Sequence, residues 1–159
     1  MDWGTPQPLF DKYNDEFDFD LDAAATFANT KCQRFIGPPG YKPYHQVLMR
    51  GPKTCVGGDA LAPGEWLGSR IWLNPPYGRE LKKWYNQVVW QAVHYKKLVV
   101  MLAPSRTDTA YWHDYVWNAA ERAPRPWVDR IDFLKGRIKF EGAEHGAPFP
   151  SAVIVFRDF

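Results

Sequence analysis

The stretch SRIWLNPPYGRELKKWYNQVVWQAVHYKKLVVMLAP, residues 69–104, decides the fold class. Residues 69–73 form an apolar run that ends at Asn74, which is typical of a buried strand. Apolar residues at positions 81, 84, 85, 88, 89, 92 and 95 then repeat at the spacing of one helix face, and residues 98–104 form a second apolar run of strand length. Strand, helix and strand in this order predict a right-handed βαβ unit with parallel strands.

The flanking sequence extends this unit to a single α/β domain over residues 1–159. Upstream, we expect a short helix ending near residue 17, a short strand in FDFDL with Asp20 and Asp22 at its end, and an Ala-rich helix over residues 23–35. Downstream, the pattern predicts a helix over residues 108–120 and strands at 131–134, 137–140 and 151–156. The expected architecture is a mostly parallel central sheet flanked by helices and closed by the C-terminal strands.

The segment 37–58, GPPGYKPYHQVLMRGPKTCVGG, interrupts this regular pattern. Proline and glycine punctuate it, so it is predicted to be a long loop or insertion that holds at most a short strand at 46–49. Its basic and aromatic residues are Tyr41, Lys42, Tyr44, Arg50 and Lys53. This mixture suits phosphate contact and base stacking, so the segment is either a target-recognition element or an idle surface insertion.

Composition narrows the class of protein without naming a partner. The 159 residues are 45% hydrophobic, which suits one domain with a real core, and the net charge of +2 is too small to indicate nucleic acid by itself. Two cysteines with His45 between them do not form a four-ligand metal site of standard spacing. No apolar run approaches the roughly 18 residues of a membrane span, and the N-terminus lacks a signal-peptide pattern, so a cytoplasmic protein is expected.

The tetrapeptide Asn74-Pro75-Pro76-Tyr77 carries the clearest chemistry. Proline disfavours helical geometry in the residue before it, so the chain leaves the strand as a stiff bend. The side-chain oxygen of Asn74 and the carbonyl of Pro75 can then accept both hydrogens of an amino group, while Tyr77 offers a face to a planar base. The alternative is a turn that only ends the strand.

The residues that surround this tetrapeptide resemble a known family. WGTPQPLFDKYNDEFDFDLDAAAT, NTKCQRF, RIWLNPPYGRELKKW, VVMLAPSRTDTAYWHDYV, GRIKF and APFPSAVIVF follow one another as in the short phage and prophage DNA N6-adenine methyltransferases. The resemblance implies a Rossmann-like methyltransferase fold, S-adenosylmethionine as cofactor and DNA as partner. It further implies a site-specific enzyme that methylates N6 of a flipped-out adenine, in the host cytoplasm if the chain is phage-encoded.

The same resemblance implies roles for individual residues. Asn74, Pro75, Pro76 and Tyr77 match the family's catalytic [DN]-P-P-[YFW] motif. The residues that correspond to its cofactor-binding positions are Thr5, Pro6, Asp20, Asp22 and Asp59.

Each cofactor-binding role has a structural alternative. Thr5 could cap the first helix with Pro6 in its first turn, Asp20 and Asp22 could be solvated strand-end carboxylates, and Asp59 could be a turn residue. The glycine-rich loop of most folds that bind this cofactor is absent, and Ala23-Ala24-Ala25 stands in its place.

Two further points stay open in the sequence. Residues 122–139 are mildly basic and are either a second DNA contact or a solvated face. The acceptor pair also suits other amines, namely cytosine N4, a guanine amine in RNA or a protein glutamine, and a chain without a glycine loop could be a non-catalytic module that binds DNA or the cofactor.

Overall fold

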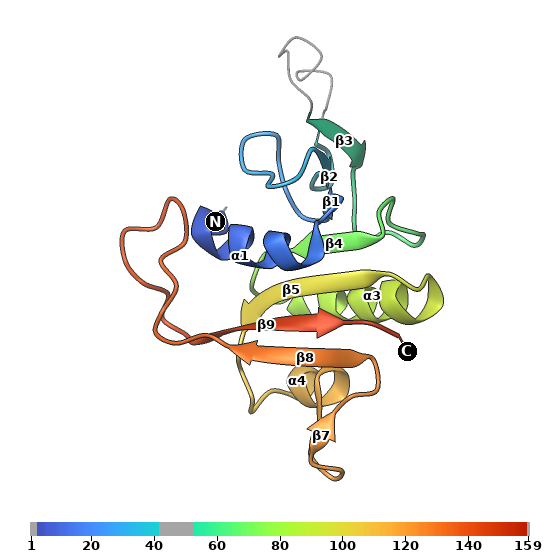
Figure 1. Ribbon diagram of the computed structural model, residues 1–159, viewed down its shortest axis with the longest axis vertical. Helices are drawn as coiled ribbons and strands as arrows, with labels where there is room; N and C mark the ends of the chain where they lie inside the picture. The colour runs from blue at the N-terminus through green and yellow to red at the C-terminus, as the bar shows by residue number, and fades with distance from the viewer. Residues whose placement is uncertain (1–2, 42–52, 159) are drawn as a thin grey trace.

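The computed structural model describes residues 3–41 and 53–158. Its centre is a seven-stranded sheet in the order β3-β2-β1-β4-β5-β9-β8 (Figure 1). The strands of this sheet are β1 (Leu21–Asp22), β2 (Arg34–Ile36), β3 (Thr54–Gly57), β4 (Arg70–Leu73), β5 (Leu98–Pro104), β8 (Val128–Phe133) and β9 (Ser151–Phe156). The pairings from β3 to β5 are parallel, and β9 is antiparallel to both of its neighbours. The predicted α/β architecture, with a mostly parallel sheet closed by C-terminal strands, is confirmed.

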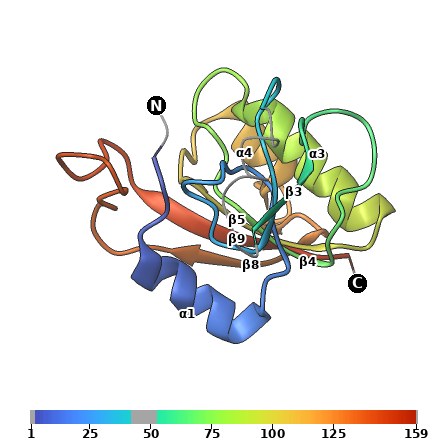
Figure 2. The same cartoon turned by 90° about the horizontal axis from the view of Figure 1, so that it is seen from above.

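Helices cover both faces of the sheet. They are α1 (Gln7–Phe17), α3 (Leu81–His94) and α4 (Ala110–Tyr115), and a small hairpin of β6 (Trp117–Asn118) and β7 (Ala123–Pro124) follows α4. Figure 2 shows α1 on one face, with α3 and α4 on the other. Within the described ranges no helix is long and apolar enough to cross a membrane.

The predicted βαβ unit is present as β4, α3 and β5. The two strands pair in parallel, with Arg70 opposite Leu98 and Leu73 opposite Met101. Helix α3 buries Leu81, Trp84, Tyr85, Val88 and Ala92 against the sheet, which is the face that the apolar spacing predicted.

Because successive strand residues point to opposite faces, the central strands build two cores. Trp72 of β4, with Val100 and Leu102 of β5, packs under α1 against Phe10 and Tyr13. The alternate residues of the same strands face α3 and α4; they are Ile71, Leu73, Val99, Met101 and Ala103. Burial on both faces explains why these strands are uninterrupted apolar runs.

The helix predicted over residues 23–35 is wrong. Its first part is a loop with a turn at 27–29, and its end is β2, which lies between β1 and β3. The Asp22 carboxylate accepts hydrogen bonds from the backbone N–H groups of Ala24 and Lys31, and Ala25 N–H donates to the Ile36 carbonyl. These bonds and the strand pairing outweigh the helix propensity of three alanines.

Three smaller predictions also need correction. Residues 137–140 are not a strand, since after β8 the chain forms a loop, in which Glu141 makes an isolated β-bridge with Gly4. The helix predicted over 108–120 is the shorter α4, and Trp117–Asn118 is a strand. The end of the predicted insertion is β3, while the suggested strand at 46–49 lies outside the described residues, as do Lys42, Tyr44 and Arg50.

Candidate functional site

A cavity of about 480 Å³ lies at the carboxyl ends of the parallel strands. The connections that follow β1, β2, β3 and β4 all contribute to its wall, which is where open α/β sheets bind ligands. The lining residues are Trp3, Ala23, Ala24, Ala25, Thr26, Gly37, Pro38, Pro39, Asp59, Ala60, Leu61, Asn74, Pro75, Pro76, Tyr77, Glu80, Trp84 and Phe149. All four residues of the predicted catalytic tetrapeptide therefore face one cavity.

Among the described residues, the charged side chains that line the cavity are both acidic. Asp59 accepts a hydrogen bond from Leu61 N–H at 3.0 Å through Oδ1, and Glu80 pairs with Lys83 at 3.0 Å. The remaining wall is mainly aromatic and aliphatic. Such a site favours a flat, apolar ligand that carries positive charge or amine donors, and it disfavours an anion.

Asn74 is held from two sides. Its Nδ2 donates to the backbone carbonyl of Trp3 at 3.0 Å, and its Oδ1 accepts from the Tyr77 hydroxyl at 2.9 Å. Because the Trp3 carbonyl can only accept, it fixes which end of the amide is nitrogen. The second lone pair of Oδ1 stays available to a donor in the cavity.

Tyr77 is anchored by its hydroxyl as well as by its ring. The hydroxyl also lies 3.1 Å from the Leu102 carbonyl of β5, and the ring meets Phe140 and Phe149 edge-on at centroid distances of 6.0 and 5.5 Å. Burial raises the pKa of Tyr77 above its ordinary value, so the hydroxyl stays protonated and acts as a donor. The sequence analysis assigned a role to the Tyr77 ring and none to its hydroxyl. Stacking of a base on the ring stays a prediction.

The two prolines of the tetrapeptide differ in their exposure to solvent. Pro75 is buried and Pro76 is exposed, and both line the cavity. Within residues 3–41 and 53–158, no hydrogen bond is donated to the Pro75 carbonyl. An acceptor pair made by this carbonyl and Asn74 Oδ1 stays a prediction.

Comparison with known proteins places this site in a family. The family model of DNA N-6-adenine-methyltransferase (Dam) matches residues 56–159, which contain the tetrapeptide and Asp59. The chain belongs to the Dam family. A DNA N-6-adenine-methyltransferase of Escherichia phage T1 is 29% identical over 125 residues, which cover 75% of this chain and 42% of that protein. The chain therefore spans less than half the length of that relative.

Solved structures share the fold at low identity. A SAM-dependent O-methyltransferase from Thermotoga maritima superposes with a TM-score of 0.56 at 6% identity, over 100% of this chain and 68% of that one. The 23S rRNA methyltransferase ErmE gives a TM-score of 0.58 at 10% identity, over 99% and 70% of the two chains. At such identities the likeness shows the Rossmann-like methyltransferase fold alone, which confirms the predicted fold.

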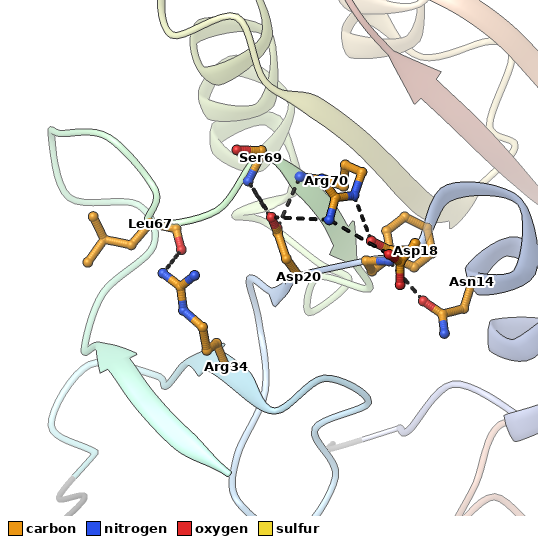
Figure 3. Close-up of polar contacts among 8 residues, drawn as sticks. Asn14, Asp18, Asp20, Arg34, Leu67, Ser69 and Arg70 are labelled. Atoms are coloured by element: carbon orange, nitrogen blue, oxygen red, sulfur yellow. Dashed lines mark hydrogen bonds and ion pairs between the residues drawn. The ribbon is translucent and has the colours of Figure 1, made fainter. Parts of the chain in front are cut away.

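In this Dam-family chain, Asp20 does not lie at the cavity. It precedes β1 instead of ending it, so it sits at the amino-terminal edge of the sheet (Figure 3). Its carboxylate accepts hydrogen bonds from Ser69 N–H at 3.0 and 3.1 Å and from Arg70 N–H at 3.0 Å. The expectation that Asp20 follows the strand is wrong, and its observed contacts stabilise the start of β4.

Asp22 ends β1 as predicted, but its carboxylate turns away from the cavity. The residue is 3% exposed and accepts from Lys31 N–H at 3.0 Å and Ala24 N–H at 3.4 Å. Burial raises the pKa of Asp22 from 3.8 to about 7, against the opposing effect of these two bonds. Asp22 shapes the Ala23–Thr26 loop, which lines the cavity, while its own side chain does not.

Thr5 and Pro6 also stay outside the cavity lining. Thr5 is 3% exposed, and Pro6 occupies the N-cap of α1 with no side-chain capping bond, so the alternative role of Thr5 as the helix cap is not observed. The N-terminal segment reaches the site through Trp3, which the sequence analysis missed. The ring of Trp3 stacks on Phe140 at a centroid distance of 5.3 Å.

Two of the basic residues between 122 and 139 serve the fold. Arg125 donates to the carbonyl of His113, and Arg130 pairs with Glu16 and Asp132. These contacts favour the structural alternative for both arginines. No group of three or more potential metal ligands occurs in the part of the chain that the structure describes.

Proposed function

We propose that this Dam-family protein transfers a methyl group from S-adenosylmethionine to N6 of a flipped-out adenine in DNA. The observation that carries the proposal is the fixed amide of Asn74, which lines the cavity together with Pro75, whose carbonyl accepts no hydrogen bond among the described residues. A DNA substrate implies action in the cytoplasm, that of the host if the chain is phage-encoded.

The cavity suits the cofactor by size and charge. Its volume of about 480 Å³ lies in the ordinary range for small ligands, and its charged lining is acidic. S-adenosylmethionine carries a sulfonium, an ammonium and an adenine amine, all of which acidic or neutral acceptors can hold. Asp59 and Glu80 would serve the charged and amine groups, and Trp3 and Trp84 would contact its apolar parts.

Small side chains replace the glycine-rich loop. Ala23, Ala24 and Ala25 all line the cavity, so their methyl groups leave room for a ligand near the backbone. When bound, the cofactor supplies an electrophilic methyl carbon.

The chain's own residues would prepare the amine for attack. An adenine amine is a poor nucleophile because its lone pair is delocalised into the ring. Hydrogen bonds from its two hydrogens to Asn74 Oδ1 and the Pro75 carbonyl favour a pyramidal nitrogen with a localised lone pair. The Tyr77 hydroxyl, whose pKa burial raises, holds Asn74 as a donor and does not act as a base.

The target base must leave the duplex to reach Asn74. Unpairing and unstacking cost a few kcal/mol, which contact with an aromatic wall partly offsets. Tyr77 and Phe149 would supply that wall.

Methylation of defined DNA tests the proposal. DNA treated with the protein and S-adenosylmethionine is digested to nucleosides, and N6-methyladenine is the expected product; finding only N4-methylcytosine would contradict the substrate. Calorimetry with S-adenosylmethionine separates an enzyme from a non-catalytic module, because no binding at millimolar cofactor contradicts catalysis.

The Asn74→Ala variant tests the mechanism. It should abolish methyl transfer and leave cofactor affinity within about threefold, since the side chain is proposed to hold the amine. Asn118→Ala is the matched control, because Asn118 lies in the β6–β7 hairpin, where its side chain accepts a hydrogen bond from Glu121 N–H. Near-normal turnover of Asn74→Ala would overturn the mechanism.

A further inference from the structure

Basic side chains lie beside the cavity, whereas the described residues that line it include no lysine or arginine. On one flank, Arg106 lies two residues after the end of β5, at the carboxyl edge of the sheet. Its guanidinium lies over the ring of Phe149 at 5.5 Å, and Phe149 lines the cavity and contacts Tyr77. The aromatic ring therefore holds this cation beside the predicted catalytic tetrapeptide.

Arg106 is exposed, and among the described residues its guanidinium has no acceptor. Arg70, Arg125 and Arg130 bond to carboxylates or carbonyls, whereas no ion pair or hydrogen bond of the Arg106 guanidinium occurs within residues 3–41 and 53–158. An arginine fixed by stacking, with all its donors free, is suited to bind an anion.

A polar groove of about 400 Å³ lies on another flank. It is lined by Leu61, Lys82, Lys83, Asn86, Gln87 and Tyr115, and Leu61 also lines the main cavity, so the two are neighbours. Lys83 pairs with Glu80, while Lys82 is exposed and forms no ion pair among the described residues. The groove thus offers one unpaired ammonium next to side-chain amides.

The two cations lie toward opposite faces of the sheet, with Tyr77 between them. Lys82 lies on α3, which packs on one face, whereas Phe149, beneath Arg106, belongs to the core under α1 on the other face, and Tyr77 contacts both cores. A strand of nucleic acid that crosses the cavity would meet positive charge before and after the position where its base enters.

We propose that Arg106 and the groove at Lys82 bind backbone phosphates of the target DNA strand on the two sides of the flipped adenosine. The inference rests on the proposed DNA substrate and assigns residues to its backbone. The acidic cavity admits the neutral base and repels phosphate, so a grip on the backbone has to lie outside it. Two such contacts hold the strand while its base is out of the stack.

The salt dependence of DNA binding tests the proposal, and this measurement does not require catalytic activity. Phosphate contacts are independent of sequence, so a fluorescein-labelled duplex of any sequence serves as the probe, with anisotropy measured from 50 to 300 mM KCl in the absence of cofactor. Loss of one contact should reduce the slope of log Kd against log salt by about 0.9 and weaken binding about fivefold at 150 mM. Arg106→Ala and Lys82→Ala should each show this change, and the double variant should show both.

Two further variants separate charge from packing. Arg106→Lys keeps the positive charge and should retain most of the slope, which a purely structural role on Phe149 would not explain. Lys12→Ala is the matched control, because Lys12 lies on α1, against the ring of Tyr13 at 5.5 Å and away from the cavity lining. Its slope should equal that of the wild type.

The outcomes distinguish this proposal from the proposed function. Wild-type slopes in both alanine variants, or no DNA binding by the wild type, would overturn the phosphate contacts. Reduced slopes together with N4-methylcytosine as the only product would support the contacts while contradicting adenine as substrate.

Discussion

Replacing Tyr77 with phenylalanine tests how Asn74 is held. The change removes the hydroxyl that donates to Asn74 Oδ1 at 2.9 Å and approaches the Leu102 carbonyl at 3.1 Å, and it keeps the ring contacts with Phe140 and Phe149. A buried hydrogen bond contributes about 0.5–1.5 kcal/mol. If that energy fixes Asn74 in the transition state, kcat should fall roughly 2- to 13-fold.

Single-turnover transfer of a radiolabelled methyl group measures this rate, and calorimetry should give an unchanged Kd for S-adenosylmethionine. The matched control is Tyr85→Phe. The Tyr85 hydroxyl is buried and lacks a hydrogen-bond partner among the described residues, so its removal should leave kcat unchanged and the free energy of unfolding equal or higher. A kcat for Tyr77→Phe equal to that of Tyr85→Phe would refute the proposed role of the hydroxyl.

Three carboxylates give further predictions. Asp20→Ala should lower the free energy of unfolding by about 0.5–1.5 kcal/mol in urea without changing the cofactor Kd, because it removes the acceptor of the Ser69 and Arg70 N–H groups at the start of β4; Asp18→Asn, at a side chain 92% exposed, should change neither. Since burial raises the folded-state pKa of Asp22 from 3.8 to about 7, its stabilisation is greatest below pH 3.8 and is lost as pH rises through 7. Urea unfolding between pH 4 and 8 should show this fall, Asp22→Asn should flatten it, and equal slopes would contradict it. Asp59→Asn should raise the cofactor Kd several-fold in calorimetry, whereas Asp108→Asn, outside the cavity lining, should not; equal affinities would remove Asp59 from the cofactor site.

The sequence predicted the parts of the fold that local pattern controls. In the unit β4-α3-β5, the strands are short apolar runs and the helix has apolar residues on one face. The two patterns differ, so the sequence distinguishes the strands from the helix. The prediction for the segment after β1 was wrong, because its conformation depends on a hydrogen bond from Lys31 N–H to Asp22, nine residues away, and on pairing of β2 with β3. Alanine propensity is a weak preference by comparison.

The sequence predicted where the cavity lies in the fold, but only some of the residues that line it. Strand ends and the tetrapeptide located Asn74, and a resemblance pointed to Asp59. Trp3 was missed because its link to Asn74 spans 71 residues and uses a backbone carbonyl, which leaves no trace in residue type. Asp20 was expected at the end of a strand in FDFDL. Strand β1 begins only at Leu21, so Asp20 precedes it and lies at the opposite edge of the sheet.

The orientation of Asn74 depends on how the N-terminal segment is tied down. Trp3 supplies the acceptor for Nδ2, and the next residue, Gly4, pairs with Glu141, whose N–H donates to the Gly4 carbonyl at 2.9 Å. The Glu141 carboxylate in turn holds the Lys31 ammonium at 2.9 Å. A Cβ at Gly4 would lie 2.9 Å from Glu141 Oε2, so a side chain there would displace the carboxylate that holds Lys31. Three segments remote in sequence therefore fix one amide, which makes the site a product of the whole fold more than of its tetrapeptide.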